Sequence, residues 1–155
     1  MNNPKRILIY AYGNPGRQDD GLANSLVEAL EPWLSEKGFG HVRTESNYQL
    51  NMEDADAIAG QDIAVFVDAS IEDIDDIHFG PVEASEGKSE FTMHASSPAY
   101  VLALCQKIYK KFPETYLLQI RGYEWEFTEG LSAQAEKNLG LALEFIKEKI
   151  LYWQD

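Results

Sequence analysis

The chain has 155 residues, 26 of them acidic and 13 basic, which gives a formal net charge of −13. This length fits one domain with its own core, so residues 1–155 are treated as a single domain. The negative charge argues against nucleic acid and anionic membranes as partners. A single cysteine, Cys105, and the lack of any apolar run near the roughly 18 residues of a membrane span predict a soluble, cytoplasmic protein.

Strands and helices alternate along the first half of the chain. Residues 5–11 are predicted to form a buried strand, followed by a Gly/Pro-rich turn and a helix that begins at Leu22. Residues 41–46 alternate weakly as a second strand, and a short helix is expected from Gln49 to Ile58. Residues 63–67 form a continuous apolar run that ends at Asp68, which is typical of a parallel strand covered on both faces.

The same alternation continues in the second half. A strand is expected over residues 77–82, a mobile loop over 84–90, a helix from Pro98 to about Phe112, a strand over 116–120, and a last helix from about Ser132. The apolar stripe of the helix from Pro98 consists of Val101, Leu104, Cys105, Ile108 and Phe112. Residues 122–127 alternate at period two, which indicates either a strand with an apolar face or a wall of a binding crevice. The order of elements predicts an α/β fold, a three-layer sandwich with a mostly parallel twisted sheet.

The segment at residues 13–21, GNPGRQDDG, delivers two adjacent carboxylates to the end of the first strand. Open α/β sheets bind ligands at the carboxyl ends of their strands. The segment is neither a dinucleotide fingerprint nor a P-loop, and two acids at a helix start would repel phosphate. Asp19 and Asp20 could bind a cation, position water or cap the following helix, and capping accounts for only one of them.

Asp68 and His94 are the candidate partners of this acid pair. In the common 2-1-3 strand order the first and third strands are neighbours, so Asp20 and Asp68 would converge over one crevice; alternatively, Asp68 pairs with backbone amides of the next turn. His94 could add a nitrogen ligand, which would suit nickel or zinc, or could bond its own backbone. His41 and His78 are expected to be structural, and Cys105 is expected in the core.

Taken in order, these motifs resemble the hydrogenase maturation endopeptidases of the NiFe-hydrogenase system, the family of the HybD- and HoxW-type proteases. The resemblance rests on residues 13–23, on Gln49-Leu50 with Glu53, on Val-Phe-Val-Asp-Ala around Asp68, and on His94. In that family, the nickel-loaded precursor of the hydrogenase large subunit is recognised through its metal, and a short C-terminal peptide is then removed.

The resemblance implies a peptidase that removes the C-terminal extension of such a precursor. Asp20, Asp68 and His94 match the family's metal-contacting set and are expected to be both the catalytic and the nickel-contacting residues. The nickel would be carried by the substrate precursor rather than bound permanently. One of these carboxylates, or Asp19, could assist the attack of water. The residues expected to position the substrate are Asn14, Asp19, Gln49 and Glu53.

Two alternatives remain open at the level of the sequence. The first is a non-catalytic binding or checkpoint module that holds the nickel-loaded precursor without cutting it. The second is an unrelated flavodoxin-like α/β enzyme in which Asp20 and Asp68 bind magnesium. Such an enzyme would have an oxygen-only, octahedral site and no role for His94.

Overall fold

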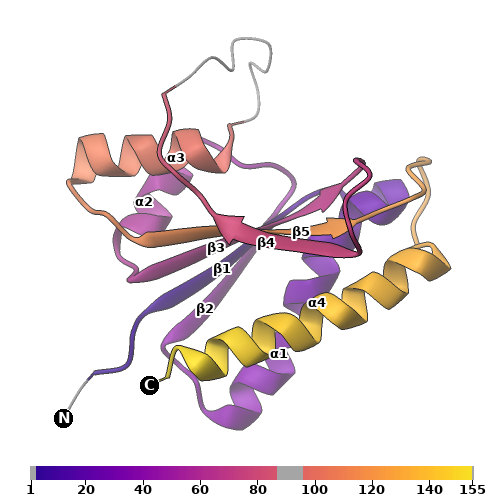
Figure 1. Cartoon of the computed structure of the whole chain (residues 1–155), viewed down its shortest axis with the longest axis horizontal. Coiled ribbons are helices and arrows are strands. Elements are labelled where there is room, and N and C mark those ends of the chain that lie inside the picture. The colour runs from indigo at the N-terminus through magenta and orange to yellow at the C-terminus, as the bar shows by residue number, and fades with distance from the viewer. Residues whose placement is uncertain (1–2, 87–95, 155) are drawn as a thin grey trace.

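The computed structural model describes residues 3–86 and 96–154, and the structural statements below concern these ranges (Figure 1). The elements are β1 (Ile7–Tyr12), η1 (Pro15–Gly21), α1 (Leu22–Lys37), β2 (Val42–Asn47), α2 (Asp54–Ala59), β3 (Ile63–Ser70), β4 (Ile77–Pro81), α3 (Pro98–Leu104), η2 (Cys105–Tyr109), β5 (Glu114–Arg121) and α4 (Ala133–Tyr152). The predicted alternation of strands and helices is therefore confirmed.

A five-stranded sheet in the order β2-β1-β3-β5-β4 forms the middle layer. All neighbouring strands run parallel except β4, which pairs antiparallel with β5. The predicted 2-1-3 start of the sheet is confirmed, because β1 lies between β2 and β3. The carboxyl ends of β1 and β3, where Tyr12 and Asp68 lie, are consequently at the same edge of the sheet.

Helices cover both faces of this sheet, with α1 and α4 on one side and α2 and α3 on the other (Figure 1). The side chains of β1 alternate between the two layers. Ile7 and Ile9 pack with α1 and α4, whereas Leu8 and Tyr10 pack with α2 and α3. Because both faces are buried, β1 and β3 have continuous apolar sequences, and the three-layer α/β prediction is confirmed.

The helix predicted from Pro98 to Phe112 is shorter than expected. It is α-helical only to Leu104 and continues as the π-helical turn η2, which ends at Lys110 with a left-handed φ of 56°. A π turn adds a residue to the helical repeat and so rotates the residues after it. The apolar stripe is therefore broken: Cys105 is buried as expected, but Ile108 in η2 is exposed, and Phe112, beyond the helix end, is exposed as well.

Two other predicted elements differ from the structure. Residues 122–127, one interpretation of which was a strand, belong to a segment without regular structure that extends to residue 132. The helix expected from Gln49 begins only at Asp54, because residues 49–53 form turns. The predicted loop at 84–90 lies mostly outside the described residues. No helix within the described ranges is long and apolar enough to cross a membrane.

Candidate functional site

The loop that joins β1 to α1 folds back tightly on itself. Asn14 Oδ1 accepts a hydrogen bond of 2.9 Å from Gly16 N–H and so starts η1. A Cβ atom on Gly13 would lie 2.1 Å from the backbone carbonyl oxygen of Asp20. Only glycine permits this contact, because no side-chain carbon fits at such a distance. Gly13 therefore fixes where Asp20 stands relative to the end of β1.

Residues 122–132 hold the middle of this loop in a strained conformation. Gln18 has φ 45° and ψ −118°, values that favour glycine. Its backbone N–H donates to Thr128 O at 2.9 Å, and its side-chain Oε1 accepts from Glu126 N–H at 2.9 Å. The neighbouring Arg17 Nε donates to Trp125 O at 3.0 Å. These contacts with the 122–132 segment balance the strain and keep the acid pair in place.

Asp19 is fully buried and binds the same segment through its carboxylate. It accepts hydrogen bonds from the backbone N–H groups of Tyr123 (2.7 Å), Glu124 (3.0 Å) and Ser132 (2.8 Å), and from the Ser132 hydroxyl (2.8 Å). Burial by itself raises the pKa of Asp19, but these hydrogen bonds outweigh it and hold that pKa below its usual range. Any effect of Asp19 on a substrate must therefore be indirect.

The expectation that Asp19 or Asp20 caps α1 is wrong. The N-cap residue of α1 is Gly21, and no side chain caps it. The kinked seven-residue η1 before α1 moves both acids away from the helix start: Asp19 turns inward to Ser132, and Asp20 turns back toward Asn14.

Asp20 and Asp68 lie close enough to influence each other's charge. Asp20 Oδ2 accepts a hydrogen bond of 2.9 Å from Asn14 N–H, which fixes one side of its carboxylate. Burial raises the pKa of Asp68, the negative charge of Asp20 raises it further, and hydrogen bonds from the Tyr12 hydroxyl and Ala69 N–H lower it, with a resulting pKa of about 7. The structure thus brings the first- and third-strand acids together.

A second polar network lies beside this pair on the α2 and α3 face. The Tyr10 hydroxyl donates to Asp54 Oδ2 at 2.6 Å and accepts from Asn47 Nδ2 at 2.8 Å. Asp54 Oδ2 also accepts from Asn51 N–H at 2.7 Å, which shapes the turn before α2. Burial raises the pKa of Tyr10 above its usual range, and Asp54 adds to this, so the phenol stays protonated.

Tyr12 and Asp54 are the polar residues at this edge that the sequence analysis missed. The period-two alternation along β1 could have predicted the position of Tyr12, because it puts Tyr10 and Tyr12 on the same face of the sheet as Asp68 of β3. The sequence contains no comparable signal for Asp54, because the helix was expected to begin at Gln49 and only the structure puts Asp54 in its first turn.

The other predicted site residues have less informative surroundings. Gln49 is exposed and donates a long hydrogen bond of 3.3 Å to Asn51 Oδ1, and Glu53 is exposed at the start of α2. His94 lies outside the described residues. His41 bonds Gln154 Oε1 at 2.6 Å, at the opposite edge of the sheet, and therefore has the structural surroundings that were expected of it. Within residues 3–86 and 96–154, no group of three or more His, Cys, Asp or Glu side chains could hold a metal ion.

The arrangement of Asp20 and Asp68 suits a cation that arrives with a ligand set of its own. Each carboxylate has about four lone-pair positions, and the hydrogen bonds from Asn14 and Tyr12 use only part of them. Two carboxylates alone make an open site, which can contact a metal without enclosing it.

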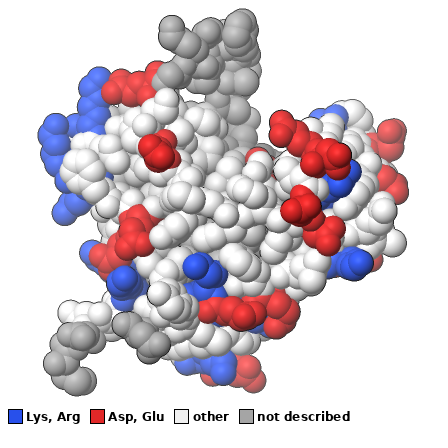
Figure 2. Space-filling view, in the orientation of Figure 1, with Lys and Arg blue, Asp and Glu red and all other residues white. Residues whose placement is uncertain are grey.

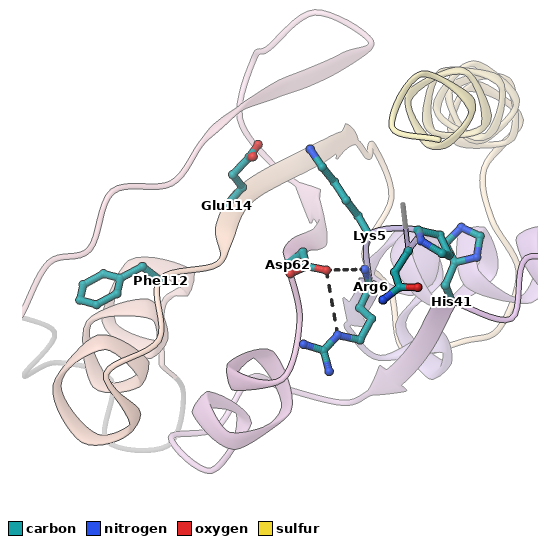
Figure 3. A pocket seen from close by; sticks show the side chains of 8 residues that line it. Lys5, Arg6, His41, Asp62, Phe112 and Glu114 are labelled. Carbon is teal, nitrogen blue, oxygen red and sulfur yellow. Dashed lines mark hydrogen bonds and ion pairs between the residues drawn. The ribbon is translucent and has the colours of Figure 1, made fainter. Parts of the chain in front are cut away.

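A large surface pocket lies elsewhere on the molecule. It has a volume of about 880 Å³ and lies at the opposite edge of the sheet, where Lys5, Arg6, Asp62 and Glu114 line it (Figure 3). The backbone N–H of Arg6 donates to Asp62 Oδ2 at 2.7 Å, and the side chains of the two residues form an exposed ion pair (Figure 3). Two of the charged residues that line the pocket are therefore paired with each other. A second pocket of about 510 Å³ adjoins the candidate site, lined in part by Gly13 and Pro15.

The fold of this chain, with its sheet order β2-β1-β3-β5-β4, is similar to that of solved hydrogenase maturation proteases. The chain superposes on HybD, the hydrogenase maturating endopeptidase of E. coli, with a TM-score of 0.67 and 23% identity over 91% of this chain and 89% of that one. It is similar to the hydrogenase maturation protease HycI of Thermococcus kodakarensis KOD1, with a TM-score of 0.74 and 20% identity over 97% and 95% of the two chains.

HybD of Thermococcus kodakarensis is also similar, with a TM-score of 0.63 and 19% identity over 94% of this chain and 99% of that chain. No protein-family model matches the sequence, and no curated protein matches it. The likeness therefore lies in the fold, and it agrees with the resemblance that the sequence motifs indicated.

Proposed function

We propose that this protein is an endopeptidase that removes the C-terminal extension from the nickel-loaded large-subunit precursor of a NiFe hydrogenase. The observation that carries the proposal is the pairing of Asp20 and Asp68 at the carboxyl ends of neighbouring parallel strands. Support comes from the fold, which is shared with hydrogenase maturation proteases along nearly the whole chain.

In this proposal, the metal belongs to the substrate. Asp20 and Asp68 contact the nickel of the precursor, and His94 completes the contact as a nitrogen ligand. A metal-bound carbonyl is polarised for attack by water, and the protein's part is to hold the scissile peptide beside the metal. Asp19 is not the base in this scheme, because its buried carboxylate is occupied by hydrogen bonds from Tyr123, Glu124 and Ser132.

Asn14, Gln49 and Glu53 are proposed to position the precursor. Asn14 acts through Asp20, to which its N–H donates. Gln49 and Glu53 lie exposed on the segment between β2 and α2, which reaches the same edge of the sheet. Asp19 positions the loop from inside rather than by contact with the substrate.

The decisive experiment incubates the protein with a nickel-loaded large-subunit precursor and detects the released peptide by mass spectrometry. Asp20→Asn should leave the fold intact and abolish release, whereas Asp75→Asn, a change of an exposed acid on the segment before β4, should leave release unchanged. Release at the normal rate by Asp20→Asn would refute the proposal. A wild-type protein that binds the precursor but never cuts it would be the checkpoint module instead.

A further inference from the structure

A groove runs between α1 and the outer edge of β2. The half next to η1 is the pocket of about 510 Å³, lined by Gly13 and Pro15, by one side of α1, and by the end of β2. A second pocket of about 540 Å³ shares Glu31 with it and continues along α1 to the start of β2 at Val42. Together, the two pockets follow the whole length of the strand.

The strand beside this groove has an unpaired edge. β2 is the outermost strand, and none of the described strands pairs with its other side. Ile7 N–H donates to His41 O and Gly13 N–H donates to Asn47 O, so the odd-numbered residues of this segment face β1. In a parallel ladder the intervening residues face the other way, so the backbone N–H and C=O groups of Thr44 and Ser46 point to the free edge.

The side chains of these two residues are already engaged with α1. Thr44 Oγ1 donates to Glu31 Oε2 at 2.8 Å, and Ser46 Oγ accepts from Asn24 Nδ2 at 2.7 Å. These bonds hold the strand against the helix and leave its backbone groups open. Fixed backbone groups along an edge are what an added peptide strand requires.

The charged side chains that line the groove determine which peptides it would attract. The charged residues that line the half next to η1 are both acidic, Glu28 and Glu31. The other half is lined by Glu31 and by one basic residue, Arg43, so the preference for basic side chains applies to the half next to η1. The whole molecule carries a formal charge of −13, and on the face shown in Figure 2 the acidic side chains are spread in several groups. Lysine or arginine side chains on an incoming peptide would be attracted, and acidic peptides would be repelled.

The groove is continuous with the candidate site. Gly13 and Pro15 line the groove and also belong to the loop that carries Asp20. A peptide that leaves the site in the direction of its own C-terminus would enter the groove at Asn47 and run toward Val42, antiparallel to β2. About six extended residues, roughly 20 Å, would match the length of the strand.

We propose that the free edge of β2 binds an extended basic peptide as an additional antiparallel strand, and that this peptide is the C-terminal extension of the precursor. The identity of the peptide rests on the proposed function; the strand-binding edge does not. Thr44 and Ser46 supply the backbone hydrogen bonds, Glu28 and Glu31 supply the charge preference, and the exposed ring of Tyr48 offers an apolar contact next to the site.

The test uses the full chain and a short fluorescein-labelled peptide of alternating lysine and valine, with binding followed by fluorescence anisotropy. Ser46→Pro removes the outward N–H without breaking a bond to β1, and Ser46→Ala is its matched control, because both variants lose the bond to Asn24. We expect Ser46→Pro to weaken binding about tenfold and Ser46→Ala less than about twofold.

Changes in the peptide test the same contact without altering the protein. A peptide N-methylated at alternate residues, which cannot form one side of the ladder, should bind at least about tenfold more weakly than its parent. A glutamate–valine peptide should not bind, and Glu28→Lys should weaken binding of the lysine peptide. Equal binding of parent and N-methylated peptides would overturn the inference.

The remaining outcomes separate the inference from the proposed function. If the protein processes the precursor and Ser46→Pro does so as well as Ser46→Ala, the groove is not used, and the proposed function stands. If the lysine peptide binds at the edge but no precursor is cut, the edge stands, and the proposed function fails. If the wild type is a dimer that Ser46→Pro converts to a monomer, the occupant is a second copy, and the inference is wrong.

Discussion

Asp19 and Ser132 share two hydrogen bonds inside the protein, although 113 residues separate them in the chain. Ser132 is also the N-cap of α4, where its hydroxyl oxygen accepts from Ala135 N–H at 3.2 Å. One carboxylate thus ties the loop of the candidate site to the start of the last helix. Asp20, its neighbour in the sequence, instead accepts a hydrogen bond from Asn14 N–H and lies near Asp68.

Replacement of Asp19 should destabilise the protein strongly. Asp19→Asn keeps the size of the side chain but replaces one carboxylate oxygen with an NH₂ group. Backbone N–H groups that donate to the carboxylate in the wild type would then face another donor. We expect a loss of about 2–3 kcal/mol in the free energy of unfolding, measured by urea denaturation. Within the described residues, the Asp20 carboxylate accepts a hydrogen bond from only one backbone N–H. Asp20→Asn should therefore change the free energy of unfolding by less than about 1 kcal/mol. Equal effects of the two variants would contradict this division of roles.

The pKa of Asp68 should respond to the charge of Asp20. Burial is the main reason that the pKa of Asp68 is about 7, and the charge of Asp20 is the second. In Asp20→Asn the second contribution disappears, so the pKa of Asp68 should fall, yet remain above that of an ordinary aspartate. An NMR titration of the Asp68 carboxyl carbon would measure it. An unchanged pKa would show that the two carboxylates are not in electrostatic contact.

Stability should depend on pH through Asp68. Its folded-state pKa of about 7 lies above the value of about 3.9 in the unfolded chain, so the folded state holds the proton more tightly. Stability should therefore fall as pH rises from about 4 to about 7 and level off above that. Asp68→Asn lacks this penalty, so at about pH 8 it should be more stable than the wild type by about 4 kcal/mol, and the difference should shrink toward about pH 4. If the difference in stability between Asp68→Asn and the wild type stayed constant across pH, this prediction would be wrong.

Gly13→Ala should displace the acid loop. The added methyl group would collide with the carbonyl oxygen of Asp20, which is backbone and cannot turn aside. We expect a loss of about 2–4 kcal/mol in the free energy of unfolding and loss of precursor processing. The matched control is Gly140→Ala in α4, where nothing lies within 4 Å of the new methyl group. It should stabilise the helix by up to about 1 kcal/mol and leave processing unchanged.

The sequence predicted the layers of the fold and the convergence of two acids because both depend on the periodic pattern of the strands. Continuous apolar runs at β1 and β3 require cover on both faces, and their shared edge brings Asp20 and Asp68 together. Nothing local indicates that Asp19 turns inward, because its partner Ser132 is remote in sequence. Proximity to α1 therefore suggested a helix cap instead.

Two other differences also have physical causes. The π turn η2 shifts the helical phase after Leu104, so Ile108 is exposed although the α-helical repeat placed it inside. Phe112 is exposed because the helix ends at Lys110, before it. In residues 122–127 the alternation indicated a possible strand, but the backbone N–H groups of Tyr123 and Glu124 bind Asp19 rather than a neighbouring strand. The contributions of Asn14, Gln49, Glu53 and His94 to a site remain predictions.

The hydrogen bonds between Asp19 and Ser132 also affect how the chain folds during translation. Ser132 is translated 113 residues after Asp19, so the Asp19 carboxylate lacks this partner until that part of the chain has been made. A chain that ends before residue 122 would leave the Asp19 carboxylate without the backbone donors of Tyr123, Glu124 and Ser132. The acid loop is thus fully held only once a much later part of the chain has folded against it.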